Sequence, residues 1–509
     1  MEDRYLVAID LGSSKLAITV ARTEGNNVHV VYYHEHESEG VDKSAILNEA
    51  KLTRALKAAI ERAESELGIK IRHAAVCMPR KDIKVVTSQA EIVLDPDKAI
   101  TIDDVQELMK IAKENCGIEN EDSEAVYSAV AQSYSDGEDF QISEQDIIGN
   151  EREKLEGNFK IFVGKKTGLK RLNKVFSDLG ITPISVFTAN STARTVLSSG
   201  EMDSGVALVE IGAGVSSVTI YVGGVLRYYG SIPFGGKIIT SDIRQECGIG
   251  ESLAENIKKG YGICLPSKLQ HMSEKKLQIR SANGGNDKQI PVKFLSEIIT
   301  ARMGEICDAM LYLIQESGLY DELRSGIVIT GGGACIANCA NLFSERSGYN
   351  VKIGYPVARF EYGSDCDGVH ETSAASSLGM ILEAKEMSEI NYADEGRSEG
   401  IKVGETYISN VRSTGSTYVP PFDRPAAPKI EPEATPETSR IFEEDEDERR
   451  ELEKIAKREA EEKEKKRKEQ EEERKMKAAK AKEKTKEKAN KAFGFLGKLF
   501  AEDDDNGEA

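Results

Sequence analysis

Apolar and polar residues follow one another with two different periods over residues 1–385. Short apolar runs, such as residues 5–9 and 16–21, are flanked by polar turns and have the length of buried strands. Over residues 49–67 the apolar positions recur every three or four residues, which predicts an amphipathic helix. Strands that alternate with helices are typical of layered α/β proteins, so we expect that class and neither an all-helical nor an all-β fold.

Residues 81–166 interrupt this alternation. They contain a strand-like stretch over 83–94, a predicted helix over 102–115, and further strand-like segments over 125–134 and 159–165. Because the surrounding pattern resumes afterwards, we expect a small α+β subdomain that is inserted into the first part of the fold.

The pattern changes again after residue 387. Residues 388–440 are rich in Gly, Ser, Thr, Pro and Glu and contain few apolar groups, which is typical of a disordered linker. Residues 442–489 consist mainly of Glu, Lys, Arg and Ala. Their many Glu/Lys pairs three or four positions apart fit a solvated single helix, and a disordered charged tether fits the same composition.

The last apolar positions of the chain form one short cluster. On a helix its large apolar residues would share one face, with two lysines outside it: Phe493, Phe495, Leu496, Leu499 and Phe500, with Lys491 and Lys498. The segment is too short to span a bilayer, but such a helix suits the surface of a membrane that contains anionic lipids. The alternative is a helix that packs against the folded body or a protein partner.

Composition limits the location and the partners of the chain. Its 509 residues suffice for two or more domains, and its net charge of −19 argues against a general nucleic-acid partner. Without a secretory signal, the eight cysteines are expected to be reduced thiols in a cytosol. Cys335 and Cys339 are spaced for a zinc site, but we favour two small buried helix residues. His34 and His36 have no third metal ligand nearby, which favours an exposed strand end.

Three glycine-centred turns carry the candidate chemistry. The first spans residues 10–15 and the second residues 210–217, each between two apolar runs, and the third spans residues 331–333 between a strand and a predicted helix. Glycine lets the backbone approach an anion closely, so that N–H groups converge on it. Each turn alone is compatible with a purely structural role, but the three together predict a nucleotide held between two related lobes.

A carboxylate stands in each of the first two turns, at Asp10 and Glu210. Two carboxylates would repel a triphosphate unless they hold Mg²⁺ through its water shell, and one of them could orient an attacking water. Hydroxyls and one ammonium group add donors for phosphate: Ser13, Ser14, Ser216 and Ser217, with Lys15. The helix expected after the third turn would favour an anion at its N-terminus.

In these features the chain resembles the superfamily of actin, heat-shock chaperone and sugar-kinase ATPases and, more narrowly, the bacterial cell-division FtsA family. The resemblance implies phosphate motifs at residues 10–15 and 210–217 and an adenosine motif at residues 331–333. It also implies two connecting helices, within residues 183–197 and 368–382.

The most FtsA-like stretches are residues 235–243 and 254–262. In the family the Glu-x-x-Lys helix lies beside the ribose and base, which implies nucleotide contacts by Glu255, Lys258 and Lys259. The resemblance further implies ATP and Mg²⁺ as cofactors, with Asp10 and Glu210 as catalytic residues and water-mediated metal ligands. The implied nucleotide contacts are Gly12, Ser13, Ser14, Lys15, Gly212, Ala213, Gly214, Ser216, Gly235, Gly236, Glu255, Lys258, Lys259, Gly331, Gly332 and Gly333.

The fold implied by the resemblance is an actin-like, two-lobed ATPase fold of the α/β class with an FtsA-type inserted α+β subdomain, a disordered or charged-helical tail and a terminal amphipathic helix. Its expected parts are the first lobe (1–80 and 167–204), the inserted interaction subdomain (81–166), the second lobe (205–242 and 326–385), a cleft-capping subdomain (243–325), a linker and charged segment (386–489), an amphipathic membrane anchor (490–501) and an acidic end (502–509).

The function implied by the resemblance is that of a structural adaptor. It would tie filaments of FtsZ to the cytoplasmic side of the cell membrane at the division site and help to assemble the septal ring. FtsZ would dock on the capping subdomain and other division proteins on residues 81–166, and copies of the chain would self-associate into filaments or oligomers. The family usually has Asp in place of Glu210, so ATP binding is expected with weak hydrolysis at most. The alternatives are a phosphotransferase, which would need an acceptor pocket, or another actin-like ATPase.

Overall fold

The computed structural model describes residues 4–395, with gaps at residues 26, 119, 138–139, 270–271, 280–287, 357–359, 364–365, 367 and 388. These residues belong to the first of two compact units, Met1–Val403, and the second unit, Gly404–Ala509, lies outside the described residues. The predicted charged segment and membrane-binding residues lie there too, and they stay predictions.

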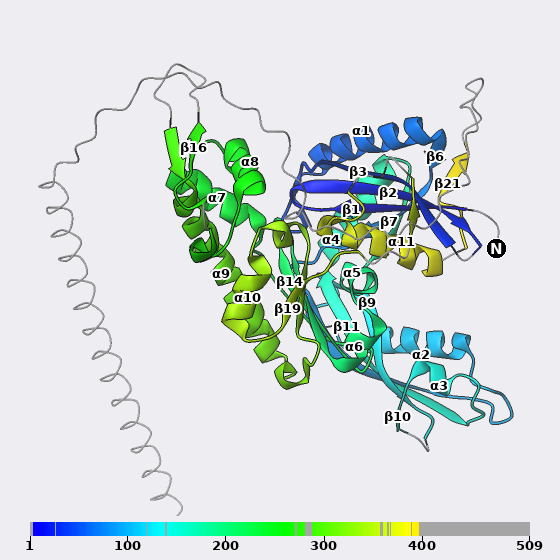
Figure 1. The fold of residues 1–509 in the computed structure, drawn as a ribbon. Helices are drawn as coiled ribbons and strands as arrows, with labels where there is room; N and C mark the ends of the chain where they lie inside the picture. The colour runs from blue at the N-terminus through cyan, green and yellow to red at the C-terminus, as the bar shows by residue number, and fades with distance from the viewer. Residues whose placement is uncertain are drawn as a thin grey trace, which may run out of the picture. The chain divides into compact units, whose positions relative to one another are not determined.

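The first lobe is built on a six-stranded sheet with the order β12-β7-β1-β2-β3-β20. Its strands are β1 (Arg4–Leu11), β2 (Lys15–Glu24), β3 (Asn27–Glu37), β7 (His73–Cys77), β12 (Thr182–Val186) and β20 (Glu361–Tyr362). Strands β1, β2 and β3 form an antiparallel meander, and β7 and β12 extend the sheet in parallel to β1. Helix α1 lies on one side of this sheet and α11 on the other, so both faces are covered (Figure 1).

Helix α1 (Glu49–Leu67) has the bounds that the apolar spacing predicts. At its start the side-chain oxygen of Asn48 accepts a hydrogen bond from the backbone N–H of Lys51 at 3.0 Å, and Gly68 ends it with a φ of 66°. Helix α4 (Lys166–Asp178) packs beside it. The buried residues of α1 are those of the predicted apolar face: Leu52, Leu56, Ala59, Ile60 and Ala63.

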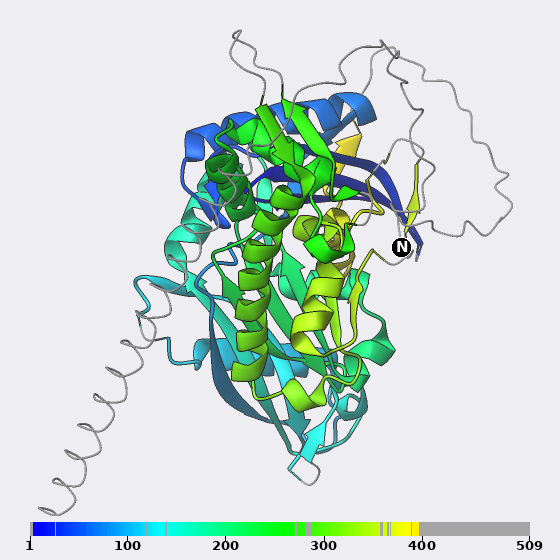
Figure 2. The same ribbon diagram turned by 60° about the vertical axis from the view of Figure 1, so that its left-hand side comes forward.

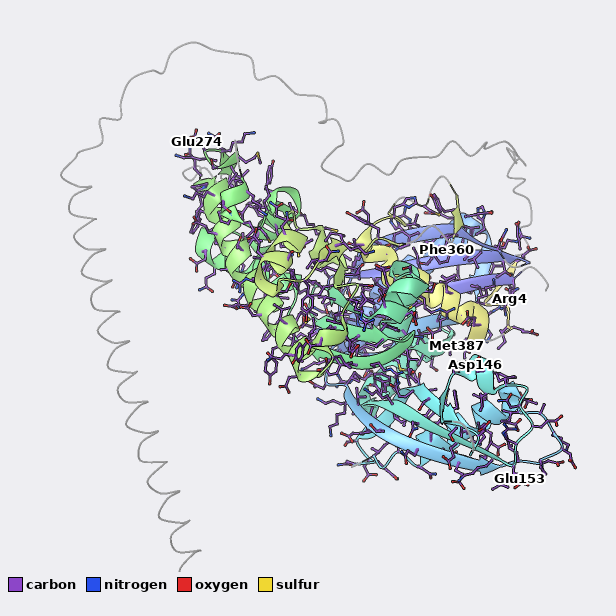
Figure 3. The ribbon with its side chains drawn as sticks, turned by 60° about the horizontal axis from the view of Figure 1, so that its bottom comes forward. Arg4, Asp146, Glu153, Glu274, Phe360 and Met387 are labelled. Atoms are coloured by element: carbon purple, nitrogen blue, oxygen red, sulfur yellow. The ribbon has the colours of Figure 1, made fainter. Side chains whose placement is uncertain are left out.

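Residues 84–165 form a separate antiparallel sheet with the order β10-β9-β11-β8. Its elements are β8 (Lys84–Val93), α2 (Ile102–Glu114), β9 (Glu124–Ser135), β10 (Phe140–Ile142), α3 (Glu144–Ile147) and β11 (Lys154–Lys165). Leu108, Tyr134 and Phe159 belong to its own core. Figure 3 shows Glu153 at the tip of this sheet, away from Phe360 of the first lobe. A role of this part in interactions stays a prediction.

The second lobe repeats the strand arrangement of the first. Its sheet has the order β15-β14-β13-β18-β19, with an antiparallel meander followed by two parallel strands. The strands are β13 (Val206–Ile211), β14 (Ser216–Val222), β15 (Val225–Ile232), β18 (Ile327–Thr330) and β19 (Val351–Ile353). Because the topologies match, the β1–β2 turn and the β13–β14 turn occupy equivalent places in their sheets.

Helices dominate the remainder of the second lobe. They are α7 (Gly236–Cys247), α8 (Glu251–Tyr261), α9 (Val292–Glu316) and α10 (Cys339–Ser347). Figure 2 shows the long α9 running lengthwise along this lobe, where it packs against α7, α10 and β14. Strands β16 (Lys276–Ile279) and β17 (Lys288–Pro291) form an antiparallel pair before α9.

Two helices, α5 (Thr188–Val196) and α11 (Ala375–Met387), pack against each other between the two sheets. A Cβ atom on Gly379 would overlap the carbonyl oxygen of Ser191, so the close approach of the helices requires glycine. The hydroxyl of Thr195 donates to the carbonyl oxygen of Ala375 at 2.9 Å. Both helices overlap the connecting helices implied by the family resemblance, and α6 (Ser199–Ser204) leads from α5 into the second lobe.

After α11 the chain returns to the first lobe. Strand β21 (Ala393–Glu395) pairs in antiparallel fashion with β6 (Ile69–Ile71), and the side chain of Tyr392 is fully buried. The carboxylate of Asp394 pairs with Arg72 at 2.9 Å. Residues 391–395 fall in the segment expected to be a linker, yet they are part of the folded body. The sequence pattern did not indicate this, because the strand that pairs with them lies more than 300 residues earlier in the chain.

Two further findings concern the described part of the chain as a whole. None of its helices combines the length and the apolar character that crossing a membrane requires. Its cysteines are free thiols.

Candidate functional site

A cavity of about 870 Å³ lies between the two lobes and is lined by residues of all three glycine turns. The predicted site residues in its lining are Asp10, Gly12, Ser13, Ser14, Lys15, Glu210, Gly212, Ala213, Gly214, Gly236, Glu255, Lys258, Lys259, Gly331, Gly332 and Gly333. Two predicted residues lie behind this surface. The buried hydroxyl of Ser216 donates to the carbonyl oxygen of Phe234 at 2.9 Å, and a Cβ on Gly235 would overlap the carbonyl oxygen of Gly212.

The first turn joins β1 to β2 and places Asp10 at the cavity. A Cβ on Gly12 would lie 2.6 Å from the carbonyl oxygen of Lys15, so the turn closes only around glycine. Ser13 is buried, and its hydroxyl oxygen accepts a hydrogen bond at 3.1 Å from the backbone N–H of Ser44.

The second turn joins β13 to β14 in the same way and touches the first. A Cβ on Gly214 would lie 2.5 Å from the hydroxyl oxygen of Ser13 and 2.9 Å from the backbone nitrogen of Lys43. Lys43 belongs to the tight turn between β4 (Val41–Asp42) and β5 (Ala45–Ile46). The floor of the cavity is therefore a three-way contact between two turns of the first lobe and one of the second.

The third turn departs from the expected strand-to-helix arrangement. Gly331 has a φ of 87°, and residues Gly332–Cys335 form a short 3-10 turn, so the α-helix begins only at Cys339. A Cβ on Gly333 would overlap the side chain of Ile211, whereas one on Gly332 would meet no atom within 4 Å. This turn therefore offers bare backbone at the cavity and no direct helix N-terminus.

One expectation about the cysteines is wrong for the same reason. Cys335 was expected to be a buried helix residue, but it lies on the 3-10 turn, is exposed, and lines the cavity. Its thiol lies 3.2 Å from the hydroxyl oxygen of Thr372. Cys339 is buried on α10, as expected.

The carboxylate of Glu210 has a partner that the sequence analysis did not identify. Nη1 of Arg80 donates to Oε2 of Glu210 at 2.8 Å, and the two side chains are only 19% and 7% exposed. Burial by itself would lower the pKa of Arg80, but the negative charges around it, that of Glu210 first among them, together outweigh burial and raise that pKa. Within the described ranges Asp10 forms no salt bridge, and burial together with the charge of Asp10 raises the pKa of the neighbouring Cys77 thiol.

A signal for Arg80 was present in the sequence. Arg80 follows the apolar run of residues 74–78, which includes most of β7, and β7 is parallel to β1. Because the carboxyl ends of parallel strands meet at one edge of a sheet, residues after β7 are brought close to Asp10 and the first turn. A basic residue at that position is a candidate for an anion site.

Lys15, which was expected to add positive charge for phosphate, is paired with Glu35. The same carboxylate accepts hydrogen bonds from the hydroxyls of Tyr33 at 2.6 Å and Ser373 at 3.1 Å. Burial would raise the pKa of Glu35, but Lys15 and these donors together lower it. Lys15 therefore lines the cavity with its positive charge already neutralised by Glu35.

The implied ribose and base contacts lie on α8 at the opposite wall. Nζ of Lys258 donates to Glu255 at 2.7 Å, to the hydroxyl of Thr240 at 2.9 Å and to the carbonyl oxygen of Gly236 at 2.9 Å. Burial lowers the pKa of Lys258, whereas the pKa of Glu255 is lowered because Lys258 and Thr240 outweigh its burial. Lys258 is 10% exposed and Lys259 is 67% exposed, so only Lys259 reaches freely into solvent.

This arrangement can accept an anionic ligand with an extended shape. Glycine backbone from both lobes offers N–H donors on the floor, and the open space at Gly332 can receive a flat group. Asp10 and Glu210 are hard oxygen ligands of the kind that hold a hydrated divalent cation. Within the described residues, no group of three or more His, Cys, Asp or Glu side chains is placed to hold a metal ion.

Comparisons with known proteins agree with each other. The family model described as "Cell division protein FtsA" matches residues 207–379. The chain is 28% identical over 395 residues to the cell division protein FtsA of Borreliella burgdorferi, covering 77% of this chain and 93% of that protein. It is 26% identical over 385 residues to the FtsA protein of Neisseria meningitidis serogroup B, covering 75% of this chain and 90% of that protein.

Among solved structures, the chain resembles one from the "PilM-PilN type IV pilus biogenesis complex". The TM-score is 0.52 at 12% sequence identity, and the match covers 75% of this chain and 98% of that one. At this identity the likeness concerns the fold alone.

Proposed function

We propose that this chain, which is similar to cell division proteins FtsA and has an actin-like fold, binds ATP with Mg²⁺ in the cavity between its lobes. One observation carries this proposal: three glycine turns, far apart in the sequence, and two carboxylates line one cavity of about 870 Å³. A structural role for each turn would not require them to meet.

In this proposal the two equivalent turns hold the phosphates. Backbone N–H groups around Gly12 and Gly214 bind the phosphate oxygens, and the Gly331–Gly333 turn lies against the adenosine, with Glu255 and Lys259 beside the ribose and base. Asp10 and Glu210 hold Mg²⁺ through water, and the bound cation supplies charge that offsets the triphosphate.

We propose weak hydrolysis at most. The side chain of Glu210 has one methylene more than the Asp that the family usually has at this position, and this shifts the carboxylate that would orient an attacking water. Rapid ATP turnover with an added small molecule would instead favour the phosphotransferase alternative.

At the level of the cell, we propose a peripheral adaptor on the cytoplasmic side of the membrane at the division site. The similarity to FtsA proteins supports docking of FtsZ on the capping subdomain (243–325), contacts of residues 81–166 with other division proteins, and self-association. The membrane contact is argued from the sequence of residues 491–500 alone, whose five large apolar side chains and flanking lysines suit anionic lipid.

The ATP site is tested by Gly332→Phe. A Cβ at this position meets no protein atom within 4 Å, so the side chain should fill the cavity without disturbing the fold. We expect calorimetry to show loss of ATP binding and circular dichroism to show an unchanged melting temperature.

The matched control is Gly200→Phe, because Gly200 also has open space around it but does not line the cavity. It should bind ATP as the wild type does. Full ATP affinity in the Gly332→Phe variant would remove the adenosine assignment, and no binding of ATP or ADP by the wild type would remove the proposed function.

A further inference from the structure

The Arg80–Glu210 pair is a charge contact between the two lobes inside the cavity. Arg80 follows β7 of the first lobe, and Glu210 ends β13 of the second. Apart from its bond through Nη1 to Glu210, the guanidinium forms no hydrogen bond with a residue of the described ranges. A planar group with up to five N–H donors therefore lines the cavity with most of its donors unused.

The backbone of Arg80 is held by hydrogen bonds of its own, which do not involve the guanidinium. Its N–H donates to the hydroxyl of Ser44 at 2.9 Å, and its carbonyl oxygen accepts from the hydroxyls of Ser231 at 3.0 Å and Tyr229 at 3.4 Å. Ser44 in turn donates from its N–H to Ser13 in the first phosphate turn. The guanidinium can therefore change partner without movement of the chain that carries it.

The turn between β4 and β5, whose Ser44 accepts the hydrogen bond from Arg80, has an unusual backbone. Lys43 and Ser44 have φ values of 46° and 59°, in the left-handed region that residues with a Cβ seldom adopt. Such conformations persist where the surroundings hold them, and they cluster at functional sites. Here the surroundings are Ser13, Gly214 and Arg80, all of them at the floor of the cavity.

Charge balance points to the group that Arg80 would bind. Lys15 forms a salt bridge with Glu35, and Lys258 forms one with Glu255. Arg80 differs from these two lysines because its partner, Glu210, is also a predicted Mg²⁺ ligand. When a hydrated cation takes over the charge of Glu210, the guanidinium loses its counterion. A phosphate group that arrives with that cation supplies a new one, and the fork of donors on arginine matches phosphate oxygens in a bidentate way.

We propose that Arg80 binds the terminal phosphate of the nucleotide and gives up Glu210 in doing so, which makes this residue the determinant of ATP over ADP. The inference rests on the proposed binding of ATP in this cavity. ADP lacks the group that replaces Glu210, so in the ADP complex the Arg80–Glu210 pair persists.

The test measures the affinities of a non-hydrolysable ATP analogue and of ADP by calorimetry with Mg²⁺ present. The wild type should bind the analogue more tightly than ADP. Arg80→Ala should lose about tenfold or more in affinity for the analogue and less than about twofold for ADP, because a charge-assisted bidentate contact is lost only in the first case. Arg80→Lys should restore part of the difference.

The control is Lys81→Ala, which removes a positive charge next to Arg80 in the sequence, on a residue that does not itself line the cavity. It should leave both affinities unchanged. Equal losses for both nucleotides in Arg80→Ala, or equal wild-type affinities for both, would overturn the inference. Failure of the wild type to bind either nucleotide would instead overturn the proposed function.

A second variant tests the exchange even if Arg80→Ala does not fold. Glu210→Gln keeps the shape of the side chain but removes the charge that competes for Arg80. Without Mg²⁺, the variant should bind the ATP analogue several-fold more tightly than the wild type, as expected for a guanidinium released from its carboxylate. Unchanged or weaker binding under these conditions would contradict the exchange.

Discussion

Single residues in the cavity wall come as charge-matched pairs that were not predicted as pairs. The sequence analysis identified Glu210, Lys15 and Lys258 as individual contacts, but the structure joins each of them to an opposite charge. Spacing along a helix could have suggested the Glu255–Lys258 pair, since residues three apart share a face. The Lys15–Glu35 pair joins two strands and the Arg80–Glu210 pair joins the two lobes, so both depend on how the folded chain brings separate segments together.

The Glu255–Lys258 pair gives a prediction on stability. Glu255→Gln leaves the buried ammonium of Lys258 without its carboxylate, so urea denaturation at neutral pH should show a loss of about 1–3 kcal/mol in the free energy of unfolding. Because the folded state lowers the pKa of Glu255, this stabilisation exists above the ordinary Glu pKa of about 4.3 and is lost as the pH falls through the folded value.

The matched control is Glu251→Gln, an exposed residue on the same helix. It should change the free energy of unfolding by less than about 0.5 kcal/mol. A difference between wild type and Glu255→Gln that persisted unchanged at pH 3 would contradict the electrostatic origin.

At the scale of elements, the spacing of apolar residues predicted the helices whose bounds depend on their own sequence. Helix α1 has its predicted bounds, and α2 (Ile102–Glu114) differs from prediction by one residue. The short strand β21 was missed because its three residues carry no pattern of their own and are ordered by pairing with β6. The helix after Gly333 was placed too early, because Gly332–Cys335 first forms a 3-10 turn in which Gly333 lies against Ile211.

The crossing of α5 and α11 gives a prediction for these elements. Gly379→Ala would place a Cβ against the carbonyl oxygen of Ser191, and this backbone atom cannot swing aside as a side chain would. We expect a loss of about 1–3 kcal/mol in the free energy of unfolding, measured by urea denaturation.

Gly260→Ala in α8 is the control, because its Cβ would meet no atom within 4 Å. This change should be neutral or should stabilise by up to about 1 kcal/mol, since alanine is the better helix former. Equal effects of the two substitutions would mean that the α5–α11 contact has no special need for glycine.

At the scale of the whole molecule, the two-lobed organisation was predictable because the turn motifs recur in similar strand contexts. The repeated order of strands in the two sheets is the physical basis of that recurrence. What composition alone could not provide is the closure of the cavity, which needs the floor contact of Ser13, Lys43 and Gly214 from segments far apart in the chain.

The proposed membrane contact is a prediction about the full chain. Deletion of residues 491–500 should abolish co-sedimentation with anionic liposomes, because the five large apolar side chains and the two lysines leave together. With FtsZ added, the same deletion should remove FtsZ from the liposome pellet.

Deletion of residues 502–509 is the control, since it shortens the chain at the same end but keeps the apolar cluster. This variant should sediment as the full chain does, or better, because acidic side chains are repelled by anionic lipid. Unchanged sedimentation after deletion of residues 491–500 would reject the anchor.

The return of the chain to the first lobe has a mechanical consequence. Any tension applied beyond Glu395 enters the folded body through β21, where it first peels Glu395, Asp394 and then Ala393 from β6. The next residue to resist is Tyr392, whose ring must be pulled out of the core and whose N–H is bonded to the carbonyl oxygen of Tyr5 at 2.9 Å. The buried ring of Tyr392 in the first lobe would thus set the force at which the pulled chain detaches. Helix α11 would come under tension only after this ring had left the core.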